Sequence, residues 1–202
     1  MRSVLAFGDS LTWGSCPDGG GRHAFADRWP NVLAKLTGLE VISDGLRGRT
    51  TAFDMPVSPA EMSGAMMLPT VLHTHAPVDL VILMLGTNDS YCGVEPEMAA
   101  RGMARLIEIV RHHPYRTPCK VPQILVVAPP VIVPSEGVTQ TMIDASHTYR
   151  ELVEQVAQAS DVAFFDSNLV ASSSNSDGFH LNAENTRAIG KALTPLVVQL
   201  MA

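Results

Sequence analysis

The chain has 202 residues, of which 46% are hydrophobic and 17% are charged, a composition typical of a compact folded protein and not of a disordered one. Its formal charge of −6 at pH 7 leaves no basic footprint of the kind that binds nucleic acid. No stretch approaches the ~20 apolar residues of a membrane span, so neither nucleic acid nor a membrane is an expected partner. The length suits one domain over residues 1–202.

The N-terminus and the cysteines indicate a cytoplasmic protein. Only five apolar-leaning residues separate Arg2 from Gly8, which is too few for the apolar core of a signal peptide. The cysteines are odd in number and show neither redox nor metal-ligand spacing: Cys16, Cys92 and Cys119. We therefore expect reduced thiols and a cytoplasmic location.

Five short apolar runs predict buried strands, in chain order at 4–7, 39–42, 80–85, 124–127 and 162–165. They lack the alternation of polar and apolar residues, which indicates strands that are covered on both faces, as in a parallel sheet. Between them, apolar residues recur at helical spacing, most clearly within 103–110, 149–156 and 189–200. Pro195 should kink or restart the last of these helices, because it lacks an N–H group.

The alternation of strands and helices predicts an α/β fold, a three-layer α/β/α sandwich with a five-stranded parallel sheet. Three connections are long for a compact domain, and such loops are usually functional: 15–27, 51–62 and 129–139. In a sheet of this kind, sites form beyond the carboxyl ends of the strands. Residues that directly follow the strands are therefore the first candidates for chemistry.

Ser10 follows the first strand, in the sequence Gly8-Asp9-Ser10-Leu11. A sharp turn there lifts its hydroxyl onto the rim of the sheet, and a helix N-terminus favours developing negative charge. Its backbone N–H could also hold an oxyanion. The alternative is a purely structural role, in an ordinary turn where Ser10 caps the following helix. Asp9 is expected to bind neighbouring backbone.

The turns after the second and third strands supply two possible donors. A glycine such as Gly48 lets the backbone approach a ligand closely and present its N–H, and Asn88 carries a carboxamide N–H. Their bland alternatives are a turn glycine and an Asx turn. Arg47 and Arg49 flank Gly48, where structural or solvated roles are favoured over contact with an anionic substrate.

Asp177 and His180 lie three residues apart near the C-terminus. This spacing lets Asp177 reach the Nδ1–H of His180 while Nε2 faces Ser10, an arrangement that predicts nucleophilic acyl chemistry. His73 and His75 have the spacing of metal ligands but no partner cluster, so neither a metal nor a cofactor is expected. The apolar side chains nearest the nucleophile are candidates for substrate binding or for core packing: Leu11, Trp13 and Phe179.

Taken together, these segments resemble the SGNH hydrolases, the GDSL-type esterases and lipases. The four residues for which that family is named fall in the family's order on Ser10, Gly48, Asn88 and His180, and Asp177 matches its Asp-x-x-His block. The likeness covers nearly the whole chain. Segments 7–14, 49–51 and 84–89 look most like the arylesterase/acyltransferase branch.

The resemblance implies a flavodoxin-like SGNH hydrolase fold with a Ser10–His180–Asp177 triad. It implies an oxyanion hole formed by Ser10, Gly48 and Asn88. The implied substrates are small aryl or alkyl esters with short acyl chains, with acyltransferase or perhydrolase side activity. A homo-oligomer is implied by the same branch, and a methionine-rich loop favours it: Met55, Met62, Met66 and Met67.

Other functions remain open on the sequence alone. The same machinery could serve a carbohydrate O-acetylesterase, a thioesterase or a lysophospholipase. Outside enzymes, a flavodoxin-like binding module would share the order of strands and helices. Such a module needs a phosphate loop or a clustered acidic pocket, and the sequence offers neither.

Overall fold

A computed structural model describes residues 2–19, 21–55 and 58–202 of the chain. Within these residues, five strands form one parallel sheet in the order β2-β1-β3-β4-β5. The strands are β1 (Ser3–Gly8), β2 (Glu40–Gly45), β3 (Leu80–Met84), β4 (Gln123–Ala128) and β5 (Ala163–Asp166). The prediction of an α/β/α sandwich with a five-stranded parallel sheet is therefore confirmed.

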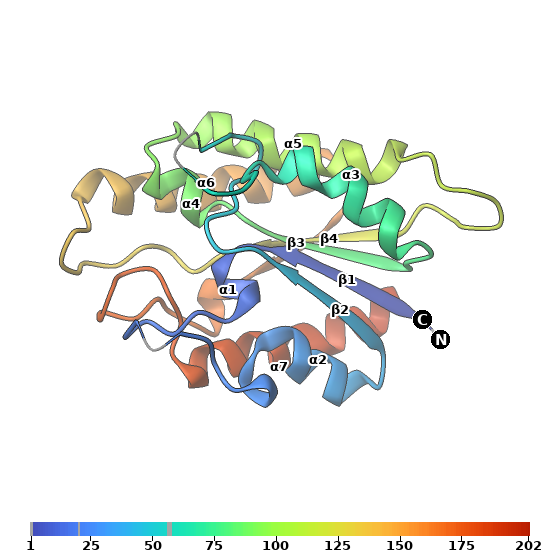
Figure 1. The fold of residues 1–202 in the computed structure, drawn as a ribbon, viewed down its shortest axis with the longest axis horizontal. Helices are drawn as coiled ribbons and strands as arrows, with labels where there is room; N and C mark the ends of the chain where they lie inside the picture. Colours follow the sequence, from blue (N-terminus) through green and yellow to red (C-terminus); the bar gives the residue numbers. More distant parts are fainter. Residues whose placement is uncertain (1, 20, 56–57) are drawn as a thin grey trace.

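Helices cover both faces of the sheet (Figure 1). One layer holds α3 (Gly64–His75), α5 (Pro96–His112) and α6 (Gln140–Ala159), and the other holds α2 (Trp29–Thr37) and α7 (Ala183–Leu200). Shorter elements follow strands or lie in loops: α1 (Ser10–Trp13), α4 (Thr87–Tyr91) and the 3₁₀ turns Phe25–Asp27 and Ser167–Leu169. No described helix combines the length and apolar character that a membrane span requires.

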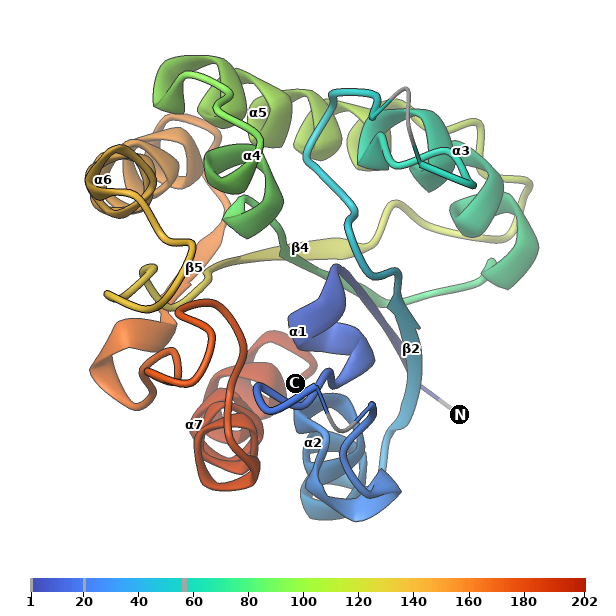
Figure 2. The ribbon, with the colours of Figure 1, turned by 60° about the vertical axis from the view of Figure 1, so that its left-hand side comes forward.

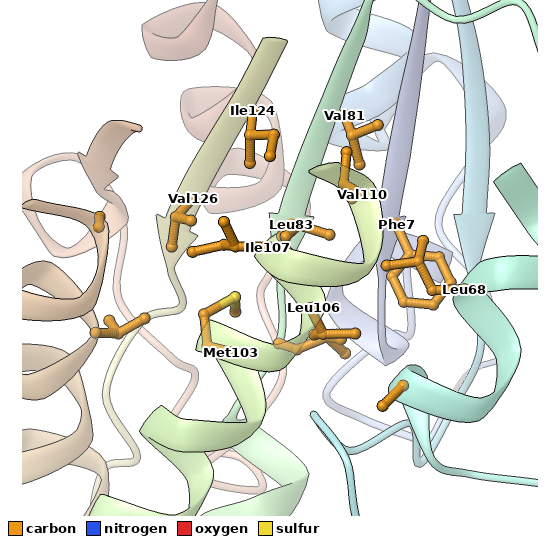
Figure 3. Close-up of a cluster of buried hydrophobic side chains, with 14 of the residues drawn as sticks. Phe7, Leu68, Val81, Leu83, Met103, Leu106, Ile107, Val110, Ile124 and Val126 are labelled. Atoms are coloured by element: carbon orange, nitrogen blue, oxygen red, sulfur yellow. The ribbon is translucent and has the colours of Figure 1, made fainter. Parts of the chain in front are cut away.

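The central strands β1, β3 and β4 are apolar apart from Ser3 and Gln123 at their starts, because successive side chains enter opposite layers. In β1, Leu5 and Phe7 join the core beneath α3, α5 and α6, whereas Val4 and Ala6 join the core beneath α2 and α7. All residues of β1 and β3 are buried. Figure 3 shows the first of these cores, where strand side chains pack against α5.

The predicted strands differ from the observed ones mainly at their ends. β2 runs three residues past its predicted end at position 42, through Ser43 and Asp44 to Gly45. Polar residues are tolerated there because β2 is an edge strand and only partly buried. Of the two effects expected of Pro195, the restart of the last helix does not occur, since α7 continues past it to Leu200, and the kink stays a prediction.

Gly45 brings the end of β2 against α1. A Cβ atom at Gly45 would lie 2.2 Å from the backbone N of Trp13 and 2.7 Å from the backbone C of Thr12. Both atoms belong to the backbone, so they cannot move aside by a change of rotamer. The close approach therefore holds α1, and with it Ser10, at a fixed height above the sheet.

We expect Gly45→Ala to lower the free energy of unfolding by at least about 2 kcal/mol, because the new methyl group overlaps backbone atoms. Urea denaturation followed by circular dichroism measures this. Gly21→Ala is the control: it adds a methyl group in open space at a positive φ, and should cost about 1 kcal/mol. Equal losses in the two variants would contradict the argument from close packing.

Candidate active site

The residues singled out from the sequence meet at the carboxyl edge of the sheet, where α1 and α4 also lie (Figure 2). Ser10 begins α1 directly after β1, Gly48 lies in the turn after β2, and Asn88 lies in α4 after β3. A loop that runs from the second 3₁₀ turn to α7 adds Asp177 and His180. These residues surround a pocket of about 620 Å³ whose lining is Ser10, Arg47, Gly48, Thr87, Asn88, Tyr91, Glu136, Gly137, Asp177, Phe179 and His180.

Hydrogen bonds connect Ser10, His180 and Asp177 in series. The Oγ of Ser10 lies 3.0 Å from Nε2 of His180, and Nδ1 of the same ring lies 2.6 Å from Oδ2 of Asp177. The other carboxylate oxygen, Oδ1, accepts the backbone N–H groups of Phe179 and His180, each at 2.9 Å. The carboxylate is thus fixed by three donors and cannot rotate freely.

This arrangement determines the tautomer of His180. A carboxylate can only accept a hydrogen bond, so Nδ1 carries the hydrogen that faces Asp177. In the neutral ring Nε2 is then the acceptor, and it faces the hydroxyl of Ser10. The lone pair that would remove a proton from Ser10 is therefore oriented by the acid on the far side of the ring.

Asp9, and not Ser10, caps helix α1. Its Oδ1 accepts the backbone N–H of Leu11 at 2.9 Å, as the sequence analysis expected of a residue tied to neighbouring backbone. The alternative in which Ser10 serves as the cap is therefore wrong. Because Asp9 takes the capping role, the hydroxyl of Ser10 is left to interact with His180.

The predicted oxyanion donors lie side by side. Asn88 donates from Nδ2 to the backbone O of Arg49 at 3.0 Å, which fixes the plane of its amide. Its second Nδ2–H has only a long contact of 3.4 Å to Oδ2 of Asp9, beyond the usual range for a hydrogen bond of this type. This N–H can exchange that weak contact for a stronger acceptor in the pocket.

Gly48 lines the same pocket with a φ of +86°, a backbone conformation that residues other than glycine rarely adopt. The positive φ turns the chain between β2 and Thr50 and so brings the backbone of residue 48 to the pocket. The N–H of Ser10 is the third predicted donor. As the first residue of α1, it has no acceptor within its own helix.

Phe179 and Tyr91 form the apolar wall, with ring centroids 5.3 Å apart in an edge-to-face arrangement. Tyr91 was missed in the sequence analysis, although it lies one helical turn after Asn88 and so shares a face with it. Of the two roles left open for Leu11, substrate binding or core packing, the structure supports core packing. Its side chain is 2% exposed and packs in the core beneath α2 and α7, because α1 turns it toward the sheet.

Trp13 is likewise not among the residues that line the pocket. Its ring lies under two guanidinium groups, with Cζ of Arg22 at 4.6 Å and Cζ of Arg47 at 5.4 Å from the ring centroid. Arg47 itself lines the pocket, whereas Arg49 is buried and pairs with Asp44. The two arginines that flank Gly48 therefore have different environments.

The three long loops each contact a segment that carries a site residue. In loop 15–27, Nε2 of His23 lies 2.8 Å from the backbone O of Leu181, next to His180. In loop 51–62, Thr51 donates from its N and Oγ1 to the carboxylate of Asp89, next to Asn88. Loop 129–139 lines the pocket with Glu136 and Gly137. The length of these three connections in the sequence had already indicated that they are functional.

Two carboxyl groups are buried beneath the site. Burial raises the pKa of Asp9 to about 7, against a hydrogen bond from Leu11 that lowers it. Burial also raises the pKa of Asp89 to about 6, against hydrogen bonds from Thr51 that lower it. Both groups thus bind protons more strongly in the folded chain than in the unfolded chain.

Comparisons with known proteins agree with this fold and site. The model of the GDSL-like lipase/acylhydrolase family matches residues 6–188. A carbohydrate acetylesterase family member from Sinorhizobium meliloti is 42% identical over 100% of this chain and 99% of its own, with a TM-score of 0.95. The native aryl esterase of M. smegmatis is 36% identical over 99% of this chain and 100% of its own, with a TM-score of 0.91.

A further carbohydrate acetylesterase from Sinorhizobium meliloti is 37% identical over 99% of this chain and 100% of its own, with a TM-score of 0.93. The search of curated protein sequences found no match. The chain belongs to the GDSL-like lipase/acylhydrolase family. It is a carboxylic ester hydrolase that acts on small-molecule esters, which confirms the resemblance to the SGNH hydrolases. The expected homo-oligomer, single domain and cytoplasmic location stay predictions.

The buried carboxyls predict that stability falls as the pH rises. Below pH ~4 Asp9 and Asp89 are protonated in the folded and in the unfolded chain. As the pH rises from there, the unfolded chain releases these protons first, so the free energy of unfolding falls until the pH passes about 6 for Asp89 and about 7 for Asp9. For Asp9 alone the loss is a few kcal/mol, at about 1.4 kcal/mol per pKa unit. We expect Asp9→Asn to flatten the decline in the free energy of unfolding between pH 4 and 8, measured by urea denaturation.

The exposed Asp54 provides the control, since Asp54→Asn should leave the slope as it is in the wild type. An unchanged slope in Asp9→Asn would contradict the raised pKa of Asp9.

Proposed function

We propose that this protein is a serine esterase that cleaves small carboxylic esters through a Ser10–His180–Asp177 triad and an acyl-enzyme, with a preference for short acyl groups. The observation that carries the proposal is the series of two hydrogen bonds from Ser10 Oγ to Nε2 of His180 at 3.0 Å and from Nδ1 to Asp177 at 2.6 Å. A hydroxyl, a base and an orienting acid in this geometry have the roles of an acyl-transfer triad.

In the first step, Ser10 Oγ attacks the ester carbonyl while Nε2 of His180 takes the hydroxyl proton. Asp177 holds the ring in place and stabilises the imidazolium that forms. His180 then gives the same proton to the departing alcohol, and the acyl group remains on Ser10. The proton moves from serine to leaving group through a single nitrogen, so His180 ends this step neutral.

The tetrahedral oxyanion is stabilised by donors that are already in position. In the proposal these are the N–H groups of Ser10 and Gly48 and the Nδ2–H of Asn88 that has only the long contact to Asp9. Donors that are fixed before the reaction need no reorganisation when charge develops, which is why such sites are effective. Support comes from the bond between Asn88 Nδ2 and the backbone O of Arg49, which holds the amide still.

In the second step, water attacks the acyl-enzyme, with His180 as the base. An alcohol or peroxide that entered the pocket could attack in the same way, because His180 removes a proton from any of them. We therefore propose acyl transfer to alcohols and to peroxide as side activities. They would compete with hydrolysis for one intermediate.

The names of two similar structures support short acyl groups, because an acetylesterase removes an acetyl group. The aromatic pair Tyr91 and Phe179 gives the pocket an apolar wall that suits an aryl leaving group. The main proposal is therefore an aryl or alkyl esterase. The second candidate, a carbohydrate O-acetylesterase, is favoured by the same two names and by the charged lining residues Arg47 and Glu136, which could bind sugar hydroxyls.

We expect Ser10→Ala to reduce turnover of 4-nitrophenyl acetate on the order of 10⁶-fold, since no other group replaces the nucleophile. Asn88→Ala should reduce it roughly 10²–10³-fold, the usual cost of one oxyanion donor. The matched control is Asn31→Ala, because Asn31 also donates Nδ2 to a backbone carbonyl, that of Phe25, but lies outside the pocket lining. Full activity in Ser10→Ala would end the proposal.

A panel of esters separates the two candidate functions. We expect 4-nitrophenyl acetate to be turned over faster than the octanoate and faster than an acetylated sugar, by kcat/KM. Faster turnover of the octanoate would contradict the short-chain preference. Faster deacetylation of the sugar would favour the carbohydrate esterase. Addition of a primary alcohol to the acetate assay should yield the product ester, detected by gas chromatography.

A further inference from the structure

Arg49 is a buried arginine that joins the ends of two strands. Its side chain is 3% exposed. Nη1 donates to the backbone O of Gly8 at 2.8 Å and to the backbone O of Asp44 at 2.7 Å, and Nη2 donates to Oδ1 of Asp44 at 2.8 Å. Its Cζ also lies 4.0 Å from the ring centroid of Phe7. One guanidinium thus holds the end of β1 to the end of β2.

The backbone of the same residue holds the predicted oxyanion donors. The O of Arg49 accepts Nδ2 of Asn88 at 3.0 Å, and its N donates to the O of Leu46 at 3.1 Å, which closes the turn that contains Gly48. Gly8, which the guanidinium binds, lies two residues before Ser10. All three predicted donors are therefore linked to Arg49 by one hydrogen bond or by a short stretch of backbone.

We propose that Arg49 is a positioning residue for acyl transfer, whose guanidinium fixes the turn after β2 so that Gly48 and Asn88 present their N–H groups to one point in the pocket. This inference rests on the proposed function, because it takes these two residues as oxyanion donors. Arg49 does not touch the substrate and acts only through its neighbours.

The chemistry of the group supports a geometric role. A buried ion pair is often replaced by apolar side chains without loss of stability, so the Arg49–Asp44 pair is better explained by the geometry it imposes than by its contribution to folding. A guanidinium is a rigid planar fork that can bind a carbonyl and a carboxylate at once. A lysine has a single side-chain nitrogen, which cannot take the places of both Nη1 and Nη2, so Arg49→Lys must lose either the two bonds to backbone oxygens or the bond to Oδ1 of Asp44.

The test is Arg49→Lys, assayed with 4-nitrophenyl acetate. We expect kcat to fall roughly tenfold to a hundredfold, part of the cost of losing a whole donor. KM should change by less than about threefold, because an interaction made only in the transition state affects kcat and kcat/KM equally. A fall in kcat of less than about twofold would overturn the proposal.

A double-mutant cycle distinguishes positioning from general damage. In the Asn88→Ala background the main donor that Arg49 orients is already gone, so Arg49→Lys should reduce kcat by less than about threefold. An undiminished effect in that background would overturn the proposal. Full turnover in Asn88→Ala alone would overturn the oxyanion role of Asn88, and with it the positioning role of Arg49. If Asn88→Ala loses turnover while Arg49→Lys keeps it, only the positioning role of Arg49 is overturned.

Two further variants guard the result. Arg187 pairs with Asp27 at 2.7 Å outside the pocket lining, so Arg187→Lys disturbs an ion pair of similar length, although a more exposed one, and should leave kcat unchanged. An equal fall in kcat for Arg187→Lys would overturn the proposal. If Arg49→Lys does not fold, Asp44→Asn serves in its place: it weakens the hold on Nη2 and should lower kcat about threefold to tenfold, again only when Asn88 is present. No fall in Asp44→Asn would then overturn the proposal.

Discussion

The parallel pairing of β1 with both of its neighbours is the constraint on which the site depends. Gly8 lies opposite Gly45 in β2 and opposite Met84 in β3, so the three strands end at one level. Whatever follows each strand begins at that level. The turns that carry Ser10, Gly48 and Asn88 are therefore brought together by the backbone hydrogen bonds of the sheet, independently of the contacts that their side chains make.

The side chains around the pocket form a floor and a wall with different properties. The floor lies at and just beyond the ends of β1, β2 and β3: Asp9, Arg49 and Asp89 are buried, Asp44 is partly buried, and hydrogen bonds hold all four. The wall is more open and comes from helix α4 and from loops, with Tyr91, Glu136 and Phe179. In the proposed function the floor fixes the oxyanion donors and the wall selects the ester, which would place geometry and selectivity in separate parts of the chain.

Most of the fold could be predicted because its signals are local. Five apolar runs identified the strands, and residues directly after strands marked the site. The features of the site that were left open or missed depend on contacts that sequence spacing does not encode. Leu11 faces the core because α1 makes a single turn whose orientation is set by Gly45 and β2. The bonds of Arg49 could not be foreseen, because two of its three acceptors are backbone oxygens, which any residue supplies. Tyr91 could have been found from its helical spacing to Asn88.

Asp9 caps α1, so the hydroxyl of the proposed nucleophile, Ser10, is not needed for that role. The side chain of Asp9, and not the hydroxyl of Ser10, accepts the backbone N–H of Leu11 at the helix N-terminus. In the proposed mechanism, an ester formed at the Ser10 oxygen replaces the hydrogen bond to His180 and leaves the cap of α1 in place. On this proposal the protein can carry an acyl group on Ser10 while α1 stays capped by Asp9, and we expect the lifetime of the acyl-enzyme to depend on the pocket and not on the stability of the chain.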